Sequence, residues 1–342
     1  MQPVQKLDNI SWFPFNDEPL LSGPWYLPAV CNPQLLLPDE SPDGRWHLFA
    51  HSWLGLHHYV STSGIAWEPS KLIEYRAHSP FVFIHKGNYY LLYEKHDRKI
   101  PFVGRSSAPS DGNNDDSSRI MLCSSPDLRT WSRPRVLLDS RSVPFSADYI
   151  HAPRVSRPQL VKTAEGFRLY FGVSQTAMPD TGELFSRYFA CAESSTIDGQ
   201  YTPSGRGPLL APGPDDPYMN LGAGSVRVLQ GQEGFAAFQC SAYWDEKLRR
   251  SRSALFVLTS QDGLKWKREP ETPILMTPQR GWAAGYIKSC DVRFKESENC
   301  WYCYYSANAA VMPGLRRESI GLLLGQVPTL QGLEATRVAN GG

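Results

Sequence analysis

A recurring pattern of apolar and polar positions divides the chain into similar units. In each unit an apolar strand leads through a polar turn to an aromatic-rich strand, as in SPFVFIHKGNYYLLYEKHD from Ser79. Similar segments begin at Asn32, Arg157, Gly224 and Cys290. Alternating apolar runs around Gly, Asp or Asn turns are typical of β-hairpins. The pattern therefore predicts five hairpins that start near residues 32, 79, 157, 224 and 290.

A second element follows the first four hairpins: a short apolar strand, then Ser with Asp or Gly, then an aromatic residue. The aromatic residues are Trp67, Trp131, Tyr201 and Trp266, and the strand SIGLLLGQV stands alone after the fifth hairpin. Because the three Trp residues recur at one repeat position, we assign them to packing between units. Five units of about four strands predict an all-β protein. We expect a five-bladed β-propeller with four-stranded blades, in which residues 1–342 form a single domain.

Composition and charge restrict the class of partner. The chain has 342 residues and a formal net charge of +1, whereas nucleic-acid binding requires a basic face. No segment approaches the roughly 18 continuous apolar residues of a membrane-spanning helix. The start MQPVQKLDNISWFPF lacks the charged and apolar regions of a signal peptide,. We therefore expect a cytoplasmic protein with no nucleic-acid or membrane partner.

The cysteines and histidines do not follow the spacing of a metal site. Seven cysteines are scattered along the chain, and the Cys300–Cys303 pair falls in a predicted strand, where residues three apart point to opposite faces,. His51, His78 and His151 could approach the axis and together hold a metal, but no H-x-H or H-E-x-x-H spacing occurs,. We expect free thiols, no metal and no cofactor.

The hairpin units followed by Ser-x-Asp-Gly-x-x-Trp resemble the five-bladed propeller glycoside hydrolases of family 43 and its relatives, families 32 and 68. Blades of these enzymes often open with Asp-Pro, apolar residues, a turn and Tyr-Tyr-Leu. SPFVFIHKGNYYLLYE carries this phrase with Ser79 in place of Asp, and Asn32-Pro33 and Arg157-Pro158 stand at the same point. The resemblance extends from about residue 30 to 327. It implies a carbohydrate-active enzyme that acts on a glycoside or sugar-derived small molecule in a central axial pocket.

The resemblance also implies acidic residues where the inner strands begin. The corresponding residues here are Asn32, Ser79, Arg157, Ser225 and Asp291. Only Asp291 keeps a carboxylate, and it is our first catalytic candidate; the alternative is a structural Asp at the propeller centre. Because an amide cannot take a proton from water, Asn32 cannot act as the base.

Glycoside hydrolysis usually requires two carboxylates, so a second must come from elsewhere. Glu94 ends the second strand of the second hairpin and could meet the pocket rim; alternatively, it is a solvated charge at a strand end. Asp148 lies in the 140–156 loop, which we expect to line the site. With His151 it could form a proton-transfer pair, or the two could belong to an ordinary turn.

The remaining candidates would bind substrate. Arg157 would present a fixed cation, which favours an anionic substrate or sugar acid; the alternative is a structural salt bridge. Trp244 could stack on a sugar ring or pack between blades. The other candidates for substrate positioning are Asn32, His51, His78, Ser79, His151 and Ser225. The predicted activity is hydrolysis or rearrangement of the substrate by carboxylate acid/base chemistry. The alternative is a non-hydrolytic propeller, either a biosynthetic enzyme or a sugar-binding pseudoenzyme that has lost the first-blade base.

Overall fold

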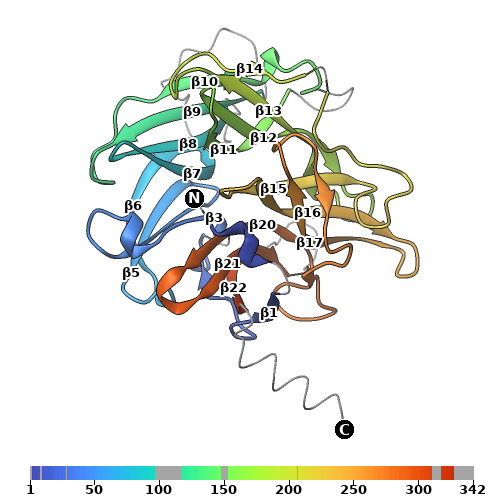
Figure 1. Cartoon of the computed structure of the whole chain (residues 1–342). Coiled ribbons are helices and arrows are strands. Elements are labelled where there is room, and N and C mark those ends of the chain that lie inside the picture. Colours follow the sequence, from blue (N-terminus) through green and yellow to red (C-terminus); the bar gives the residue numbers. More distant parts are fainter. Residues whose placement is uncertain are drawn as a thin grey trace.

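The computed structural model describes residues 2–7, 10–27, 29–96, 117–147, 153–205, 207–309 and 317–326. Five antiparallel sheets surround a common axis (Figure 1). Each sheet is a blade of four principal strands, so the predicted five-bladed β-propeller is confirmed. No helix in these ranges is long and apolar enough to cross a membrane. Two predicted site residues, Asp148 and His151, lie outside the described residues.

Blades one to three are continuous in sequence, and each is built from strands that pair with their neighbours in chain order. Blade one contains β3 (Cys31–Leu36), β4 (Trp46–His51), β5 (Gly55–Ser61) and β6 (Glu68–Tyr75). Blade two contains β7 (Ala77–His85), β8 (Asn88–His96), β9 (Ser118–Ser125) and β10 (Arg135–Asp139). Blade three contains β11 (Val155–Lys162), β12 (Phe167–Ala177), β13 (Leu184–Ser194) and β14 (Thr202–Pro203).

Blade four has a short extra strand, and blade five combines the two ends of the described chain. Blade four contains β15 (Gly222–Gln230), β16 (Phe235–Asp245), β17 (Arg250–Ser260), β18 (Lys267–Arg268) and β19 (Leu275–Met276). Blade five contains β20 (Ile287–Lys295), β21 (Cys300–Asn308) and β22 (Glu318–Gln326), with β1 (Ser11–Pro14) and β2 (Leu21–Ser22). Four 3-10 turns are also described: η1 (Val4–Leu7), η2 (Pro38–Glu40), η3 (Ser140–Ser142) and η4 (Glu296–Glu298).

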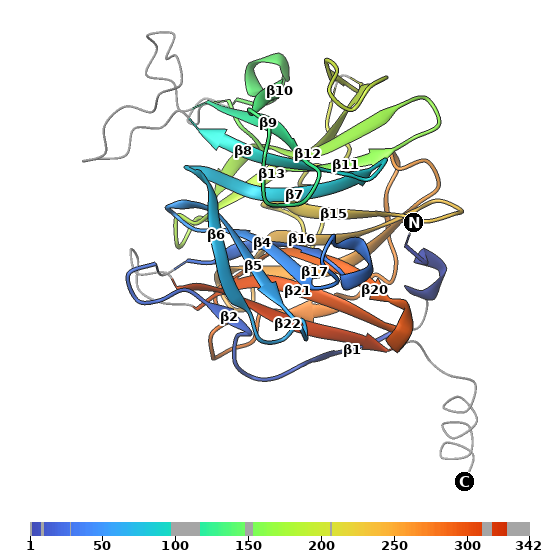
Figure 2. The ribbon, with the colours of Figure 1, turned by 90° about the vertical axis from the view of Figure 1, so that its left-hand side faces the viewer.

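The fifth blade is completed by the N-terminal strand. β1 pairs with β22 in antiparallel register, with Trp12 opposite Gly325, and β2 pairs further along the same strand. Figure 2 shows β1 and β22 side by side along one edge of the molecule. The outer strand of blade five, which the repeat pattern did not supply, therefore comes from the opposite end of the chain and closes the ring.

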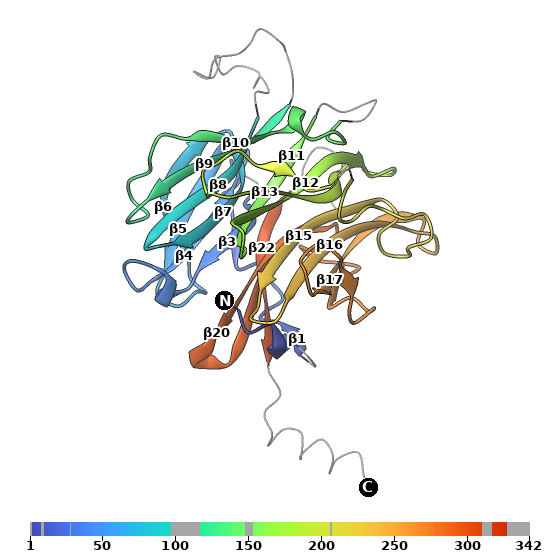
Figure 3. The ribbon, with the colours of Figure 1, turned by 45° about the horizontal axis from the view of Figure 1, so that its top comes forward.

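The core lies between neighbouring blades, and the three repeated tryptophans belong to it. Trp67 of blade one meets Tyr304 of blade five with ring centroids 6.1 Å apart. Trp266 of blade four meets Tyr170 of blade three at 6.3 Å. Trp131 packs against a cluster shared by blades one and two. Their assignment to inter-blade packing is consistent with these contacts. In Figure 3 blades one and two lie together, with blade four opposite.

The inner strands β3, β7, β11, β15 and β20 lie nearest the centre of the ring (Figure 1). Each has a register shift close to its start. At this shift Asn32, Ser79, Arg157 and Gly224 have positive φ angles of 53°, 53°, 50° and 66°. An extra residue re-aims the side chains at such a bulge. The bulges therefore turn the first residues of the inner strands toward one region near the axis.

Candidate functional site

A cavity of about 190 Å³ is lined by residues from the starts of the inner strands and from nearby strand ends. Its walls come from blades one, two, three and five. Six of the predicted site residues line it: Asn32, His51, His78, Ser79, Glu94 and Arg157. The structure therefore brings together side chains from three predicted hairpins, which start near residues 32, 79 and 157.

Glu94 is the most deeply buried carboxylate of this cavity, with 1% of its side chain exposed. Its Oε1 accepts a 2.7 Å hydrogen bond from Nε of Arg154 and lies 2.8 Å from Nε2 of His96. Burial alone would raise the pKa of Glu94, but Arg154 and His96 hold it well below its ordinary value. Oε2 has no hydrogen-bond partner among the described residues. Glu94 is thus an ionised carboxylate, and one of its oxygens is buried without a hydrogen bond to the described residues.

Two neutral imidazoles lie beside Glu94. The rings of His51 and His78 meet edge-on with centroids 4.7 Å apart. Burial lowers the pKa of both rings, that of His78 to about 4. The backbone N–H of Ser79 donates to Nδ1 of His51 at 3.2 Å. The proton of neutral His51 therefore sits on Nε2, which is 3.3 Å from Sγ of Cys31,. Burial raises the pKa of Cys31, so its sulfur is a thiol.

Asn32 is held by hydrogen bonds on both sides. Its Nδ2 donates to Oγ of Ser79 at 2.7 Å, and its Oδ1 accepts from Oγ of Ser289 at 2.7 Å. These bonds join blades five, one and two near the axis. Asn32 therefore forms a fixed polar wall of the cavity and carries no group that can take a proton.

Four charged residues that the sequence did not single out complete the cavity: Arg154, Glu183, Lys288 and Glu318. The Nζ of Lys288 forms an ion pair with Oε1 of Glu183. Glu318, the first residue of β22, is half-buried and lies close enough to Cys31 to hydrogen-bond it. Arg154 belongs to the loop that we expected to line the site. For Glu183 and Glu318 the only signal in the sequence was an acidic residue next to a predicted strand.

Asp291 lies elsewhere. It is fully buried; Leu35 donates its backbone N–H to Oδ2 at 2.6 Å, and Arg227 Nε lies 2.6 Å from Oδ1. The register shift of β20 falls between Ile287 and Ser289, two residues before Asp291. Ser289, rather than Asp291, therefore stands at the blade-opening position. The carboxylate joins blade five to blades one and four and is not among the cavity-lining residues.

Two other predicted residues are displaced from the cavity. Gly224 takes the left-handed position of blade four, so Ser225 is shifted by one residue. Ser225 lines a smaller space of about 40 Å³ that Asn32, Ser79 and Arg157 also border. Trp244, near the end of β16, is half-buried and donates its backbone N–H to Oδ1 of Asn220. It does not line the cavity.

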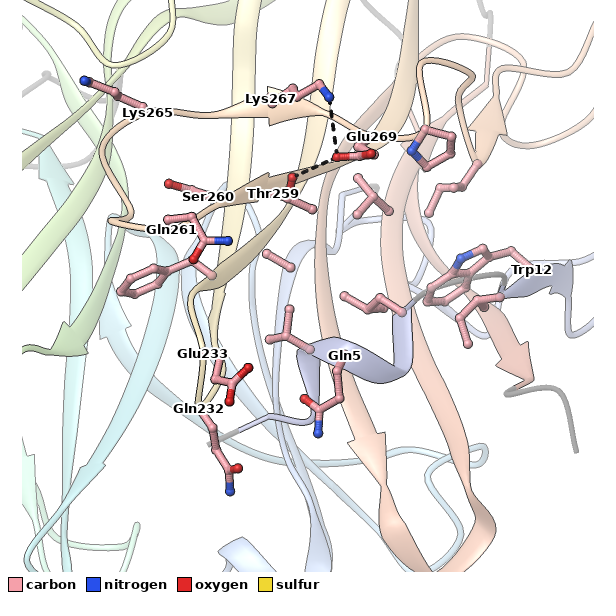
Figure 4. A pocket seen from close by; sticks show the side chains of 18 residues that line it. Gln5, Trp12, Gln232, Glu233, Thr259, Ser260, Gln261, Lys265, Lys267 and Glu269 are labelled. Atoms are coloured by element: carbon pink, nitrogen blue, oxygen red, sulfur yellow. Dashed lines mark hydrogen bonds and ion pairs between the residues drawn. The ribbon is translucent and has the colours of Figure 1, made fainter.

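A larger groove of about 1190 Å³ lies between the N-terminal segment and blade four (Figure 4). Its wall mixes apolar and polar side chains, with Trp12 at one end, and Glu269 contacts Thr259 and Lys267. None of the predicted site residues lines it. Since the buried charges and neutral imidazoles gather in the axial cavity, that cavity is the candidate site. No group of three metal-ligating side chains was found in the described part of the chain.

Comparison with known proteins shows the fold. No protein-family model matches the sequence, and no curated protein matches it. A solved glycoside hydrolase is similar with a TM-score of 0.61 and 11% identity over 95% of each chain. A thermostable family-43 glycoside hydrolase is similar with a TM-score of 0.56 and 13% identity over 86% of this chain and 88% of the other.

A third similar structure is an N-acetylgalactosamine deacetylase from F. plautii in complex with blood group B trisaccharide. Its TM-score is 0.57 and its identity 14%, over 92% of this chain and 95% of the other. These likenesses show that the chain shares the five-bladed propeller of carbohydrate-active proteins.

Proposed function

We propose that the chain is a carbohydrate-active enzyme that hydrolyses a glycoside in the axial cavity by carboxylate chemistry. The observation that carries the proposal is that Glu94, Glu183 and Glu318, from blades two, three and five, line one cavity. Glycosidases need one carboxylate that is ionised and one that can deliver a proton. A single cavity that gathers carboxylates from separate blades can supply both.

Glu94 is suited to the role of base or nucleophile. Its pKa is held well below the ordinary value, and its Oε2 is free of partners in the described structure. A free carboxylate oxygen can accept a proton from water or attack the anomeric carbon. Arg154 and His96 orient the other oxygen.

Glu318 is the better of the remaining two carboxyls for the acid. Glu183 forms an ion pair with Lys288, and an ammonium partner in direct contact favours the ionised form,. The charge of Glu318 also acts on Lys288, but without an ion-pair contact among the described residues. Glu318 is half-buried at the start of β22, where it can exchange protons with solvent. In its protonated form it would donate a proton to the leaving glycosidic oxygen. Asp148, in the 140–156 loop, stays a further candidate for this role.

The size of the cavity favours a single sugar unit. Pockets that enclose drug-sized ligands measure roughly 300–1,000 Å³, whereas this cavity measures about 190 Å³. Asn32, Ser79 and the neutral imidazoles of His51 and His78 offer hydrogen-bonding groups for sugar hydroxyls,. We therefore expect the enzyme to act on a terminal sugar rather than in the middle of a chain.

A panel of 4-nitrophenyl glycosides tests the proposal. Wild type should release nitrophenol from at least one of them, and Glu94→Gln should lower kcat by about 10²–10⁴-fold. Glu318→Gln should lower the rate most for substrates with poor leaving groups. Glu246→Gln is the matched control, because Glu246 is 78% exposed on the surface. If Glu94→Gln folds and turns over at the wild-type rate, the proposed mechanism is wrong.

One observation favours a second candidate, a propeller that binds or converts sugars without hydrolysis. Asn32 stands at the blade-opening position of blade one, and its amide is locked between Ser79 and Ser289. Under this candidate, calorimetry would detect sugar binding at the axial cavity while the whole glycoside panel stays intact. Loss of that binding in Ser79→Val would locate it at this wall.

A further inference from the structure

Arg157 occupies a backbone position that is costly for its residue type. Its φ is 50°, in the left-handed region, and the equivalent residue of blade four is Gly224. Left-handed φ is unfavourable for a long side chain and easy for glycine. Strain of this kind persists where the side chain has a role. The unfavourable backbone conformation therefore indicates that the guanidinium of Arg157 has a role in the cavity.

The cavity cations differ in their partners. Arg154 is paired with Glu94, and Lys288 is paired with Glu183. For Arg157 the only side-chain hydrogen bond in the described structure runs from NH1 to Oγ of Ser186, at 3.0 Å. Its Nε is buried and has no hydrogen-bond partner among the described residues. The guanidinium is thus the cavity cation that lacks a carboxylate within ion-pair distance in the described ranges.

The surroundings of Arg157 suit an incoming anion. Burial and the nearby charge of Arg154 lower the pKa of Arg157, and Glu94 and Glu318 act in the opposite direction. An arginine stays charged even so. A desolvated cation without a partner is unfavourable, and a planar carboxylate satisfies a guanidinium through two parallel hydrogen bonds. Such a ligand would also complete the bonding of the buried Nε.

We propose that Arg157 binds the carboxylate of a terminal sugar acid, so that the axial cavity selects glycosides of the uronic-acid class. Turnover of such glycosides rests on the proposed glycosidase function, whereas recognition of the free sugar acid does not. The neutral wall formed by Asn32, Ser79, His51 and His78 would then contact the ring hydroxyls.

The test compares acid and neutral sugars of the same stereochemistry by titration calorimetry and ligand-observed NMR. The probes are glucuronate with glucose, galacturonate with galactose, and glucose 6-phosphate. Wild type should bind one of the two acids about 10- to 100-fold more tightly than its neutral partner. Arg157→Gln should abolish this preference, so that the acid binds no more tightly than its neutral partner. Arg157→Lys should keep part of it, since the charge remains but the paired geometry is lost.

Arg249→Gln is the matched control, because Arg249 is 80% exposed and should leave the preference intact. The proposal is overturned if wild type binds the neutral sugars as tightly as both acids, if Arg157→Gln keeps the preference, or if the sugar phosphate binds more tightly than either acid. Should Arg157→Gln not fold, the wild-type comparison and Arg157→Lys still decide. If wild type binds a sugar acid but cleaves no glycoside, the proposed hydrolysis is wrong, and the inference that Arg157 recognises a carboxylate still stands.

Discussion

Arg154 donates a 2.7 Å hydrogen bond from Nε to Oε1 of Glu94 across the boundary between blades two and three. The Glu94 side chain is 1% exposed and that of Arg154 is 25% exposed. The carboxylate is therefore buried while the guanidinium is partly exposed, and the guanidinium keeps the buried carboxylate ionised. The same contact fixes the loop before β11 against β8 and places a charged oxygen at the cavity wall.

The first prediction removes the cation of this pair. Arg154→Gln leaves the buried Glu94 charge with His96 as its remaining close partner, which should lower the free energy of unfolding by about 3 kcal/mol at pH 7. The pKa of Glu94 should then rise, because the charge that most strongly opposes burial is gone and only His96 and His78 still lower it,. As the pH falls, Glu94 of the variant becomes neutral, and the difference from wild type should shrink. Urea unfolding at pH 7 and pH 4.5 measures this, and an equal deficit at both would contradict it.

The second prediction concerns Asp291, whose Oδ1 lies 2.6 Å from Nε of Arg227. Asp291→Asn should lower the free energy of unfolding by about 3–5 kcal/mol, because the buried guanidinium of Arg227 loses its ion-pair partner and that of Arg293 keeps only Glu40,. The control is Asp198→Asn: its pair with Arg135 is about half exposed, and such pairs are worth less than about 1 kcal/mol. Unchanged stability of Asp291→Asn would argue against the structural role and return it to the catalytic candidates.

The sheets could be predicted because their signals are local. Each hairpin carries its own turn and alternating strands, so five units were visible without any long-range information. The closure of blade five was not visible, since β1 (Ser11–Pro14) is four residues long and pairs with β22 more than three hundred residues away. Nothing in a short aromatic segment before the first repeat indicates that it pairs with the strand near the other end of the chain.

The site could be predicted only in part, because bulges move residues by one or two positions. Where an X-Pro pair marks the bulge, as at Asn32, Ser79 and Arg157, the predicted residues line the cavity. Blades four and five lack that pair, and Ser225 and Asp291 were assigned one and two residues too far along. Glu183 and Glu318 were missed because the sequence does not show whether an acidic residue at a strand end points into the axial cavity or into solvent.

The third prediction follows from the buried histidines of blade one. Nε2 of His58 lies 2.8 Å from Nδ1 of His47, and the ring stacks on Phe49 with centroids 4.5 Å apart. Burial lowers the pKa of His58 to about 3. The unfolded chain therefore protonates first, and stability should fall as the pH drops from about 6.5 toward 3.

His58→Phe removes one such proton uptake. The slope of the free energy of unfolding against pH should decrease by up to about 1.4 kcal/mol per pH unit between pH 6 and pH 4.5. Denaturant unfolding at several pH values gives both slopes. Parallel curves for wild type and variant would show that His58 takes up its proton equally in both states.

The last prediction concerns ring closure. Trp12 of β1 stands opposite Gly325 of β22 and meets Phe238 of blade four with ring centroids 5.6 Å apart. Removing residues 1–14 would expose the backbone edge of β22 and open the contact between blades four and five. Unpaired edges recruit other chains. The truncated protein should therefore melt at a lower temperature and self-associate in size-exclusion chromatography.

A synthetic peptide of residues 2–22 added to the truncated protein separates closure from general damage. If β1 acts as a closing strand, the peptide should raise the melting temperature in a concentration-dependent manner, because a ligand of the folded state stabilises it by mass action. The same peptide with Trp12→Ala should act more weakly. In the full chain Trp25→Ala is the control, since Trp25 is 88% exposed and should change stability by less than about 0.5 kcal/mol,. A truncated protein as stable and monomeric as wild type would show that the ring does not depend on β1.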